Sequence, residues 1–269
     1  MSGADGAAAI ELRGVYKAFR GKPVLRGLDL EIRRGETFTI LGGSGSGKSV
    51  CLKHMIGLLR PDAGRVLVEG RDITPLREDE LVEVRRQVSM VFQSAALFDS
   101  LTVYQNVAYP LREHRDWDEA RIAARVTECL DAVGMPGCEG LMPAELSGGM
   151  RKRVGVARGI ALEPRILLYD EPTTGLDPAN QRRVGELIRE LQRRLGITSV
   201  IVTHELELCF AISDRVALLK GGRIVETGAS QAMRGSDHPD VRAFLAGVQD
   251  ATGADIPGPR ALLSPRGGV

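Results

Sequence analysis

The sequence predicts an α/β fold whose core is a mainly parallel sheet, with an antiparallel β subdomain and a helical insertion. Short apolar runs that are rich in β-branched residues and do not alternate with polar ones occur at residues 37–41, 88–92, 166–169 and 199–202. Such runs are typical of strands buried on both faces of a parallel sheet. Earlier in the chain, residues 24–32 alternate and Val66 and Val68 lie in another short run, which indicates a group of antiparallel strands.

Helical patterns separate these runs, and this alternation favours a parallel sheet that helices cover on both sides. The first clear helix covers residues 118–133, where Asp116 with Glu119 resembles a capping box and Gly134 supplies the stop. The apolar residues that recur there at helical spacing are Ile122, Val126, Leu130 and Val133.

The second clear helix covers residues 178–195, with Pro178 in its first turn and Gly196 at its end. Its predicted apolar face consists of Val184, Leu187, Ile188, Leu191 and Leu195. Further on, the stretch VALLKGGRIVETG predicts a β-hairpin that turns at Gly221 and Gly222.

Length and composition favour one domain with subdivisions. A chain of 269 residues with 43% hydrophobic content can bury one sizeable core, but hardly two large independent ones. The small and polar residues 1–9 and the Gly-, Pro- and Ala-rich residues 247–269 are expected to be flexible. Between them we expect one domain over residues 10–246, divided into a core of residues 10–95 and 160–246 and a helical subdomain of residues 96–159.

Charge and hydropathy exclude several classes of protein. Lysine and arginine total 36 against 35 aspartates and glutamates, so the net charge of +1 argues against a globally basic surface for nucleic acid. No window approaches the roughly eighteen apolar residues of a membrane span, and the N-terminal residues lack the pattern of a signal peptide. We therefore expect a cytoplasmic protein that reaches a membrane only through a partner. Reduced, packed thiols are expected at Cys51, Cys129, Cys138 and Cys209.

A glycine-rich stretch, GGSGSGKS, fits the phosphate-binding pattern GxxxxGK[ST] between a predicted strand and a predicted helix. Its glycines let successive backbone N–H groups point at a phosphate chain, and the helix adds the positive end of its dipole. We expect Lys48 to bridge the outer phosphates and Ser49 to coordinate Mg²⁺. A plain glycine turn would not explain why strand, full motif and helix coincide. The candidate phosphate ligands are Gly42, Gly43, Ser44, Gly45, Ser46, Gly47, Lys48 and Ser49.

An apolar strand further along the chain ends in two carboxylates, Asp170 and Glu171. In an enzyme with a phosphate loop, the residue at this position holds Mg²⁺ on the side opposite to the loop. We assign that role to Asp170. Glu171 can then accept a proton from an attacking water, a contribution worth roughly a hundred- to ten-thousand-fold in rate. Alone, such a pair would more often be a solvated turn, but together with the phosphate loop it predicts hydrolysis.

With these motifs the chain resembles the nucleotide-binding subunits of ATP-binding cassette (ABC) transporters, over roughly residues 10 to 230. The motifs stand in the family's order: the phosphate loop, VFQ with Gln93, LSGGM at residues 146–150, LLYDEP, and VTHE with His204. Two accessory elements match as well, TTGLDP with Asp177 and YKAFRG with Phe19. The resemblance implies the fold of a P-loop NTPase ABC nucleotide-binding domain, with ATP and Mg²⁺ as ligands and ATP hydrolysis coupled to transport as the activity.

Three of these residues also have plainer explanations. Gln93 could be an ordinary amide at a strand end, His204 a surface histidine, and Phe19 a packing residue of a strand. The order of the motifs favours Gln93 as a contact of Mg²⁺ or its water, and His204 as the residue that holds Glu171 and the phosphate. The resemblance implies that Phe19 stacks on adenine and that Asp177 is the aspartate of the family's D-loop.

The LSGGM motif belongs, in this family, to the ATP site of the neighbouring subunit. The resemblance therefore implies that Ser147 and the amides of Gly148 and Gly149 face a γ-phosphate bound by a second copy. A helix N-terminus supplies about half a positive charge and unpaired N–H groups, so two such ends can enclose one triphosphate. We expect a head-to-tail dimer that ATP closes and hydrolysis loosens. Met150 stands where most relatives have glutamine, and its effect on the interface is left open.

The segment ALFDSLTVYQNVAYPLRE, the LSGGM variant and the ending HPDVRAFLAG are similar to the ATPase subunits of Mce/Mla-type systems, which move phospholipids or other lipids between bacterial membranes. This likeness implies an integral membrane permease, a lipid-binding substrate protein and a small cytoplasmic accessory subunit as partners, and a peripheral place at the cytoplasmic side of the inner membrane. Two alternatives stay open: an amino-acid or other small-solute importer, and a soluble ABC ATPase without a transport role. A small-molecule phosphotransferase would leave LSGGM unexplained.

Overall fold

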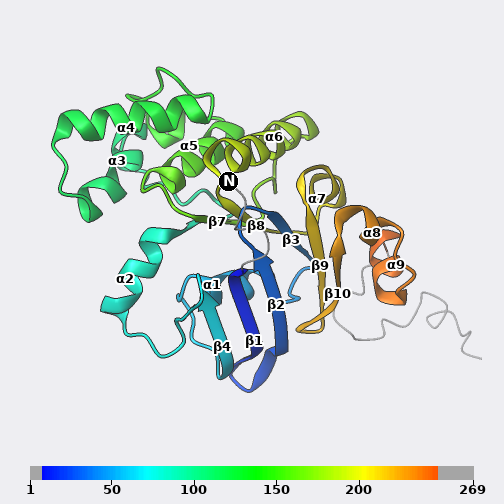
Figure 1. Ribbon diagram of the computed structural model, residues 1–269. Helices are drawn as coiled ribbons and strands as arrows, with labels where there is room; N and C mark the ends of the chain where they lie inside the picture. Colours follow the sequence, from blue (N-terminus) through cyan, green and yellow to red (C-terminus); the bar gives the residue numbers. More distant parts are fainter. Residues whose placement is uncertain (1–7, 248–269) are drawn as a thin grey trace, which may run out of the picture.

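Two sheets and the helices around them form an α/β fold in residues 8–247, which the computed structural model describes (Figure 1). The larger sheet has the strand order β10-β9-β3-β8-β7-β6, and its neighbouring strands are parallel except for β10 and β9. The predicted mainly parallel core is therefore confirmed. Its strands are β3 (Thr37–Leu41), β6 (Val88–Val91), β7 (Ile166–Asp170), β8 (Thr198–Thr203), β9 (Arg215–Lys220) and β10 (Arg223–Ala229).

The smaller sheet is antiparallel and has the order β2-β1-β4-β5. It lies at the bottom of the view in Figure 1, and it confirms the predicted antiparallel β subdomain. The predicted hairpin at the other end of the chain is confirmed as well, because Gly221 and Gly222, with φ of 58° and 79°, join β9 to β10. The strands of the smaller sheet are β1 (Ala8–Phe19), β2 (Lys22–Arg33), β4 (Ala63–Val68) and β5 (Arg71–Asp72).

Helices cover both faces of the larger sheet, as strand β7 shows. Ile166 and Leu168 pack in one hydrophobic cluster with α1 and the antiparallel sheet, whereas Leu167 and Tyr169 pack in a second cluster with α3 to α6. Figure 1 accordingly draws α1 below the larger sheet and α3 to α6 above it. The helices are α1 (Lys48–Met55), α2 (Glu78–Gln87), α3 (Val103–His114), α4 (Glu119–Ala132), α5 (Gly148–Ile160), α6 (Pro178–Leu195), α7 (Leu206–Ile212), α8 (Ser230–Arg234) and α9 (Pro239–Leu245).

The start of α4 corrects the predicted capping box. Asp118 is the N-cap residue, and its Oδ1 accepts a hydrogen bond from the backbone N–H of Arg121 at 2.8 Å. Asp116 lies outside the helix, and Glu119 pairs instead with Arg112 on α3, with an Oε2–Nη2 distance of 2.7 Å. The N-cap residue therefore lies two residues later than the predicted capping box placed it, and the helix begins at Glu119, one residue after its predicted start.

Helix α6 follows its prediction except at its last residue. Asp177 caps its N-terminus, Pro178 is in its first turn, and Gly196 ends it in the left-handed conformation. Four residues of the predicted apolar face are buried, but Leu195 has 48% of its surface exposed. The cause is that the last turn of α6 borders a surface cavity instead of the packed cluster.

The ends of the predicted domain can be compared with the structure only in part. Strand β1 begins at Ala8, and Ala9 is completely buried, so the predicted flexible segment 1–9 overlaps the sheet by two residues. Residues 1–7 and 248–269, which hold the rest of both predicted flexible segments, lie outside the described residues. The division into a core and a helical subdomain stays a prediction.

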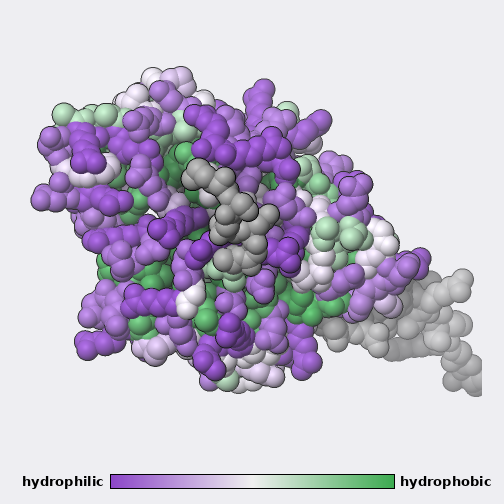
Figure 2. All heavy atoms as spheres, viewed as in Figure 1, coloured by the Kyte–Doolittle hydropathy of each residue, from purple (hydrophilic) through white to green (hydrophobic). Residues whose placement is uncertain are grey.

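The surface and the cysteines agree with the composition. Figure 2 shows this face of the molecule as mainly hydrophilic, with hydrophobic atoms exposed in patches, mostly in the lower half of the view. None of the helices within residues 8–247 is both long enough and apolar enough to cross a membrane. The cysteines are free and buried, as predicted, and burial raises the pKa of the Cys129 thiol to about 11, which makes it unreactive.

Gly64 gives a test of how closely β4 and β1 approach. Its φ is +88°, and a Cβ there would lie 2.2 Å from the carbonyl oxygen of Gly14 on β1. A left-handed backbone costs a residue with a Cβ about 1–2 kcal/mol, and the overlap adds to this cost. We expect Gly64→Ala to lower the free energy of unfolding by more than about 2 kcal/mol in thermal or denaturant unfolding.

Gly70 provides the matched control, because its φ of +80° is similar but a Cβ there would meet nothing within 4 Å. Gly70→Ala should therefore show the backbone cost alone. Equal losses for the two variants would contradict the close approach at Gly64.

Candidate active site

The loop of residues 42–49 joins the end of β3 to the start of α1. Gly42 has no room for a side chain, because a Cβ there would lie 2.6 Å from the carbonyl oxygen of Leu219. At Gly43 and Gly45, by contrast, a Cβ would meet nothing within 4 Å, so the loop is open on that side. The first N–H groups of α1 have no acceptors within the helix. Packing thus shapes one side of the loop, and the other side is an open cradle for an anion.

Lys48 and Ser49 point to the acidic pair at the end of β7. The Lys48 ammonium donates to the carbonyl oxygens of Gly42 and Gly43 at 2.7 and 3.1 Å, and it lies 3.3 Å from Glu171 Oε1. The Ser49 hydroxyl donates to Asp170 Oδ1 at 2.8 Å. The structure therefore brings together the predicted phosphate, metal and catalytic groups of this half of the site.

Asp170, the last residue of β7, is 8% exposed. Burial raises the pKa of its carboxyl group, and the nearby charge of Glu171 adds to this, while the hydrogen bond from Ser49 lowers it. A cation at this place would favour the ionised form. The hydroxyl and carboxylate oxygens suit Mg²⁺, which typically takes one or two protein oxygens and completes its shell with phosphates and water. Residues 8–247 hold no cluster of three or more histidine, cysteine or acidic side chains that could hold a metal ion.

Glu171 has a left-handed backbone, with φ of 47°, and its N–H donates to the carbonyl oxygen of Val202 on β8 at 2.9 Å. Its carboxylate is held on both sides. Oε1 faces Lys48, and Oε2 lies 2.9 Å from His204 Nδ1 and accepts a hydrogen bond from Thr174 at 3.2 Å. His204, which follows β8, thus contacts Glu171 as predicted, while Thr174 is an addition that the sequence did not single out.

Ser147 and Gly148 form a second helix N-terminus. Ser147 is the N-cap residue of α5, its Oγ accepts from the N–H of Met150 at 3.2 Å, and both Ser147 and Gly148 are exposed. Met150 is partly buried against the cluster that contains α3 to α6. The exposed end of α5 therefore has unpaired N–H groups that an anion can reach.

Gly149 and Asp177 lie close together at the starts of α5 and α6. A Cβ at Gly149 would lie 3.2 Å from Asn180 Oδ1, and Asn180 in turn donates to Asp177 Oδ2 at 2.5 Å. Within residues 8–247, no hydrogen bond or ion pair joins residues 147–149 to the loop 42–49. Because α1 and α5 cover opposite faces of the larger sheet, the structure separates the predicted phosphate ligands into two groups.

The two remaining predicted residues are at the margins of the first group. Gln93 lies two residues after β6 with an exposed side chain, and its carbonyl oxygen accepts from the buried ammonium of Lys152 on α5. Phe19, at the end of β1, is 42% exposed, and the Lys17 ammonium lies 5.6 Å from its ring centre. Both side chains are exposed to solvent, so a ligand can reach them as the predicted roles require.

Lys152 is a residue that sequence reasoning missed. It is 7% exposed, and it also lies 3.4 Å from the carbonyl oxygen of Glu171. Burial lowers the pKa of its ammonium group, whereas the charges of Glu171 and Glu205 partly offset this. In the sequence it stands between Arg151 and Arg153 in one basic run, and only the helical phase after Ser147 distinguishes the residue that faces inward.

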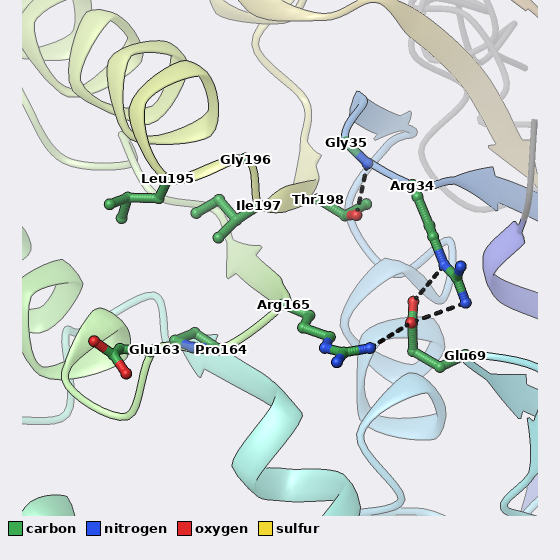
Figure 3. Close-up of a pocket in the computed structure, with 10 residues that line it drawn as sticks. All are labelled: Arg34, Gly35, Glu69, Glu163, Pro164, Arg165, Leu195, Gly196, Ile197 and Thr198. Carbon is green, nitrogen blue, oxygen red and sulfur yellow. Dashed lines mark hydrogen bonds and ion pairs between the residues drawn. The ribbon is translucent and has the colours of Figure 1, made fainter. Parts of the chain in front are cut away.

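A cavity of about 280 Å³ lies at the opposite end of the larger sheet (Figure 3). Glu69 pairs there with Arg34 and Arg165, at 3.0 and 3.3 Å, and none of the predicted site residues lines it. Arg165 and Thr198 stand at the amino ends of β7 and β8. Ligands of open α/β sheets bind outside the carboxyl ends of the strands, which is the edge that carries Asp170 and Glu171.

Known proteins are similar to this chain in sequence. The chain is 42% identical to the probable ribonucleotide transport ATP-binding protein mkl of Mycobacterium leprae, over 89% of this chain and 69% of that protein. It is 47% identical to the methionine import ATP-binding protein MetN of Symbiobacterium thermophilum, over 81% of this chain and 67% of that protein. It is 39% identical to the intermembrane phospholipid transport system ATP-binding protein MlaF of Escherichia coli, over 90% of each chain.

Solved structures agree with these relatives. The fold is similar to a dimeric ATP-binding cassette solved in a post-hydrolysis state with ADP and Pi, with a TM-score of 0.76 and 31% identity over 82% of this chain and 98% of that chain. Residues 25–174 match the family described as ABC transporter. The chain therefore belongs to the ABC transporter family, as an ATP-binding subunit that hydrolyses ATP with Mg²⁺.

Proposed function

We propose that two copies of the chain hold each ATP between the loop 42–49 of one copy and Ser147, Gly148 and Gly149 of the other. The observation that carries this proposal is the separation of two anion-binding helix ends on opposite faces of one sheet. In a single chain the N-terminal end of α5 is exposed. In a head-to-tail dimer, the partner's α5 end can complete the site at the loop 42–49. The dimeric state of the similar cassette with ADP and Pi supports the same arrangement.

In this site the chain's residues divide the work of binding. The N–H groups of the loop 42–49 and the Lys48 ammonium bind the phosphates, and the partner's Ser147 adds its hydroxyl at the γ-phosphate. Phe19 stacks on the adenine. Ser49, Asp170 and Gln93 are the residues that would hold Mg²⁺, which when bound neutralises charge on the phosphates. Asp177 caps α6 next to Gly149. The loop that contains Asp177 therefore lies at the proposed interface.

Glu171 is the general base of the proposed reaction. Its carboxylate accepts a proton from water as the water oxygen attacks the γ-phosphorus and the bond to the ADP oxygen breaks. His204 and Thr174 hold Oε2, which orients the carboxylate and leaves Oε1 beside the phosphate loop. Lys48, now paired with that oxygen at 3.3 Å, can exchange it for a phosphate oxygen when ATP binds.

The dimer drives a membrane permease that moves phospholipid or another lipid, in our proposal. The similarity to MlaF over nine-tenths of both chains supports this proposal.

We assign the permease contact to the exposed aromatic pair Phe98 and Tyr109, whose ring centres are 5.0 Å apart. Asn106, completely buried, fixes this surface because its amide donates to the carbonyl oxygens of Phe98, Leu101 and Thr102. The chain would then sit peripherally at the cytoplasmic side of the inner membrane, with a lipid-binding protein and a small cytoplasmic subunit as further partners.

A solute importer is the second candidate, because the identity to a methionine import ATP-binding protein is 47%. Both candidates use the same hydrolysis chemistry, so they differ only in the permease and its cargo. The soluble ABC ATPase without a transport role would have no permease partner.

The first prediction concerns Glu171. Glu171→Gln should keep ATP binding, lower kcat by about a hundredfold or more because the general base is lost, and trap a dimer in ATP and Mg²⁺. Light scattering coupled to gel filtration measures the dimer. Glu207→Gln, an exposed residue in the first turn of α7, is the matched control and should behave as the wild type. A monomer of Glu171→Gln in ATP would contradict the proposal.

The second prediction tests whether Ser147 acts in the partner's site. Ser147→Arg and Lys48→Ala should each abolish turnover. A mixed dimer of the two variants contains one site in which both halves are intact, so an equal mixture should regain up to about a quarter of the wild-type rate. If both halves belonged to the same chain, the mixture would stay inactive.

The third prediction separates the cargo classes. With its co-purified permease in proteoliposomes, the ATPase rate should rise with phospholipid content and not with methionine. Phe98→Ala with Tyr109→Ala should lose the permease while the ATPase rate of the free subunit is kept. Tyr16→Ala, an exposed aromatic residue on β1, is the control. Stimulation by methionine alone would favour the importer.

A further inference from the structure

The segment that follows Gln93 is a turn with an unusual backbone. Ala95 and Ala96 have φ of 62° and 47°, a region that glycine adopts freely and residues with a Cβ rarely do. Ala95 is 1% exposed, and its N–H closes the turn on the carbonyl oxygen of Phe92 at 2.8 Å. Two such residues in succession persist only where the surroundings hold them. We refer to residues 93–96 as the Gln93 turn.

Two cations of α5 hold the Gln93 turn by its carbonyl oxygens. Lys152 Nζ donates to the carbonyl oxygen of Gln93. Arg158 donates through Nη2 to the carbonyl oxygen of Ala95 at 2.9 Å and through Nη1 to that of Ala96 at 2.7 Å. Hydrogen bonds from charged donors are stronger than neutral ones. The conformation of the turn therefore depends on α5.

Gly155 allows α5 to come close enough. Residues 152, 155 and 158 are three apart, so they share one face of the helix. A Cβ at Gly155 would lie 3.0 Å from the Cβ of Ala95. Lys152, Gly155, which has no side chain, and Arg158 therefore lie against the turn along one face of the helix.

Lys152 extends the contact to the catalytic carboxylate. Its ammonium lies 3.4 Å from the carbonyl oxygen of Glu171, whose φ of 47° is left-handed as well. In the described part of the chain, no carboxylate lies within ion-pair distance of this ammonium. An apolar side chain of similar size is often as stabilising as a buried ion, so packing alone does not explain a lysine here.

We propose that Lys152 and Arg158 form a clamp through which α5 sets the positions of Gln93 and Glu171. Because Ser147 is the N-cap residue of α5, the helix whose end meets the partner's nucleotide is also the one that donates to these carbonyl oxygens. A shift of α5 is then passed to the Gln93 turn and to the catalytic base together. The two cations are positioning residues, since neither touches the substrate. This inference rests on the proposed function, because it uses the roles given there to Gln93, Glu171 and Ser147.

The first test measures hydrogen exchange in the full chain. In Lys152→Met the amide of Ala95 should exchange about tenfold faster or more, because the turn opens locally without unfolding of the domain. Arg153→Met is the matched control: Arg153 is the next cation of α5, but its Nη1 donates to the carbonyl oxygen of Gly134 at 2.9 Å, away from the turn. This control should leave the exchange of Ala95 unchanged.

The second test separates positioning from general loss of structure. Lys152→Met should lower kcat by about tenfold or more, since a small misplacement of catalytic groups is costly. KM should stay within about threefold of the wild-type value, and the stoichiometry of ATP binding should be unchanged. Arg158→Lys keeps the charge but loses the planar guanidinium that donates to the two carbonyl oxygens through two separate nitrogens, so it should give an intermediate rate. The effects of the two substitutions combined should be less than additive, because both act on one turn.

The outcomes distinguish the clamp from the proposed function. If Lys152→Met and Arg158→Lys match Arg153→Met in exchange and in kcat, the clamp is wrong, and a dimer of Glu171→Gln trapped in ATP would still support the shared site. If Glu171→Gln hydrolyses ATP normally, the proposed function fails, whatever the exchange of Ala95 shows. Should Lys152→Met not fold, Arg158→Lys alone gives the same two readouts.

Discussion

The parallel pairing of β3, β8 and β7 is the constraint on which the active site depends. In register, Leu41 stands opposite Thr203 and Asp170 stands opposite Val202, so the segments after all three strands leave the sheet at one edge. The phosphate loop, Glu171 and His204 meet there although they are far apart in the chain. Since each strand is buried on both faces, packing fixes the position of its end. The polar side chains at that edge therefore contact one another, with distances of 2.8–3.3 Å between their nitrogen and oxygen atoms.

The same sheet that assembles one half of the site keeps the other half away from it. Helix α1 begins at the phosphate loop on one face, whereas α5 packs on the other face with α3, α4 and α6. Two helix N-termini with unpaired N–H groups therefore lie at different places on the molecule. In the proposed head-to-tail dimer, association places both ends around one triphosphate and removes exposed, uncompensated N–H groups.

Three of the six residues with a left-handed backbone other than glycine in residues 8–247 are Glu171, the proposed catalytic base, and the neighbouring Ala95 and Ala96. None of these three residues is a glycine, and charged or polar side chains hold each of them by hydrogen bonds. Residues of this kind persist where the surroundings over-determine them, commonly at functional sites. Lys152 and Arg158 of α5 contribute to that support, so in our proposal the helix that faces a partner also sets the local geometry of Glu171.

The sequence by itself determined the class of fold, the phosphate loop, the acidic pair and the family, because these depend on periodicity and on residue types at fixed short spacings. It also determined Pro178 in the first turn of α6, the end of that helix at Gly196, and the hairpin at Gly221 and Gly222. It misplaced the cap of α4, took Leu195 as buried and overlooked Lys152, Thr174 and Arg158. Those features were decided only by the tertiary structure, because whether a polar side chain finds a buried carbonyl oxygen, or an apolar one finds a neighbour, depends on segments that are distant in the chain and meet only when the sheet and its helices have packed.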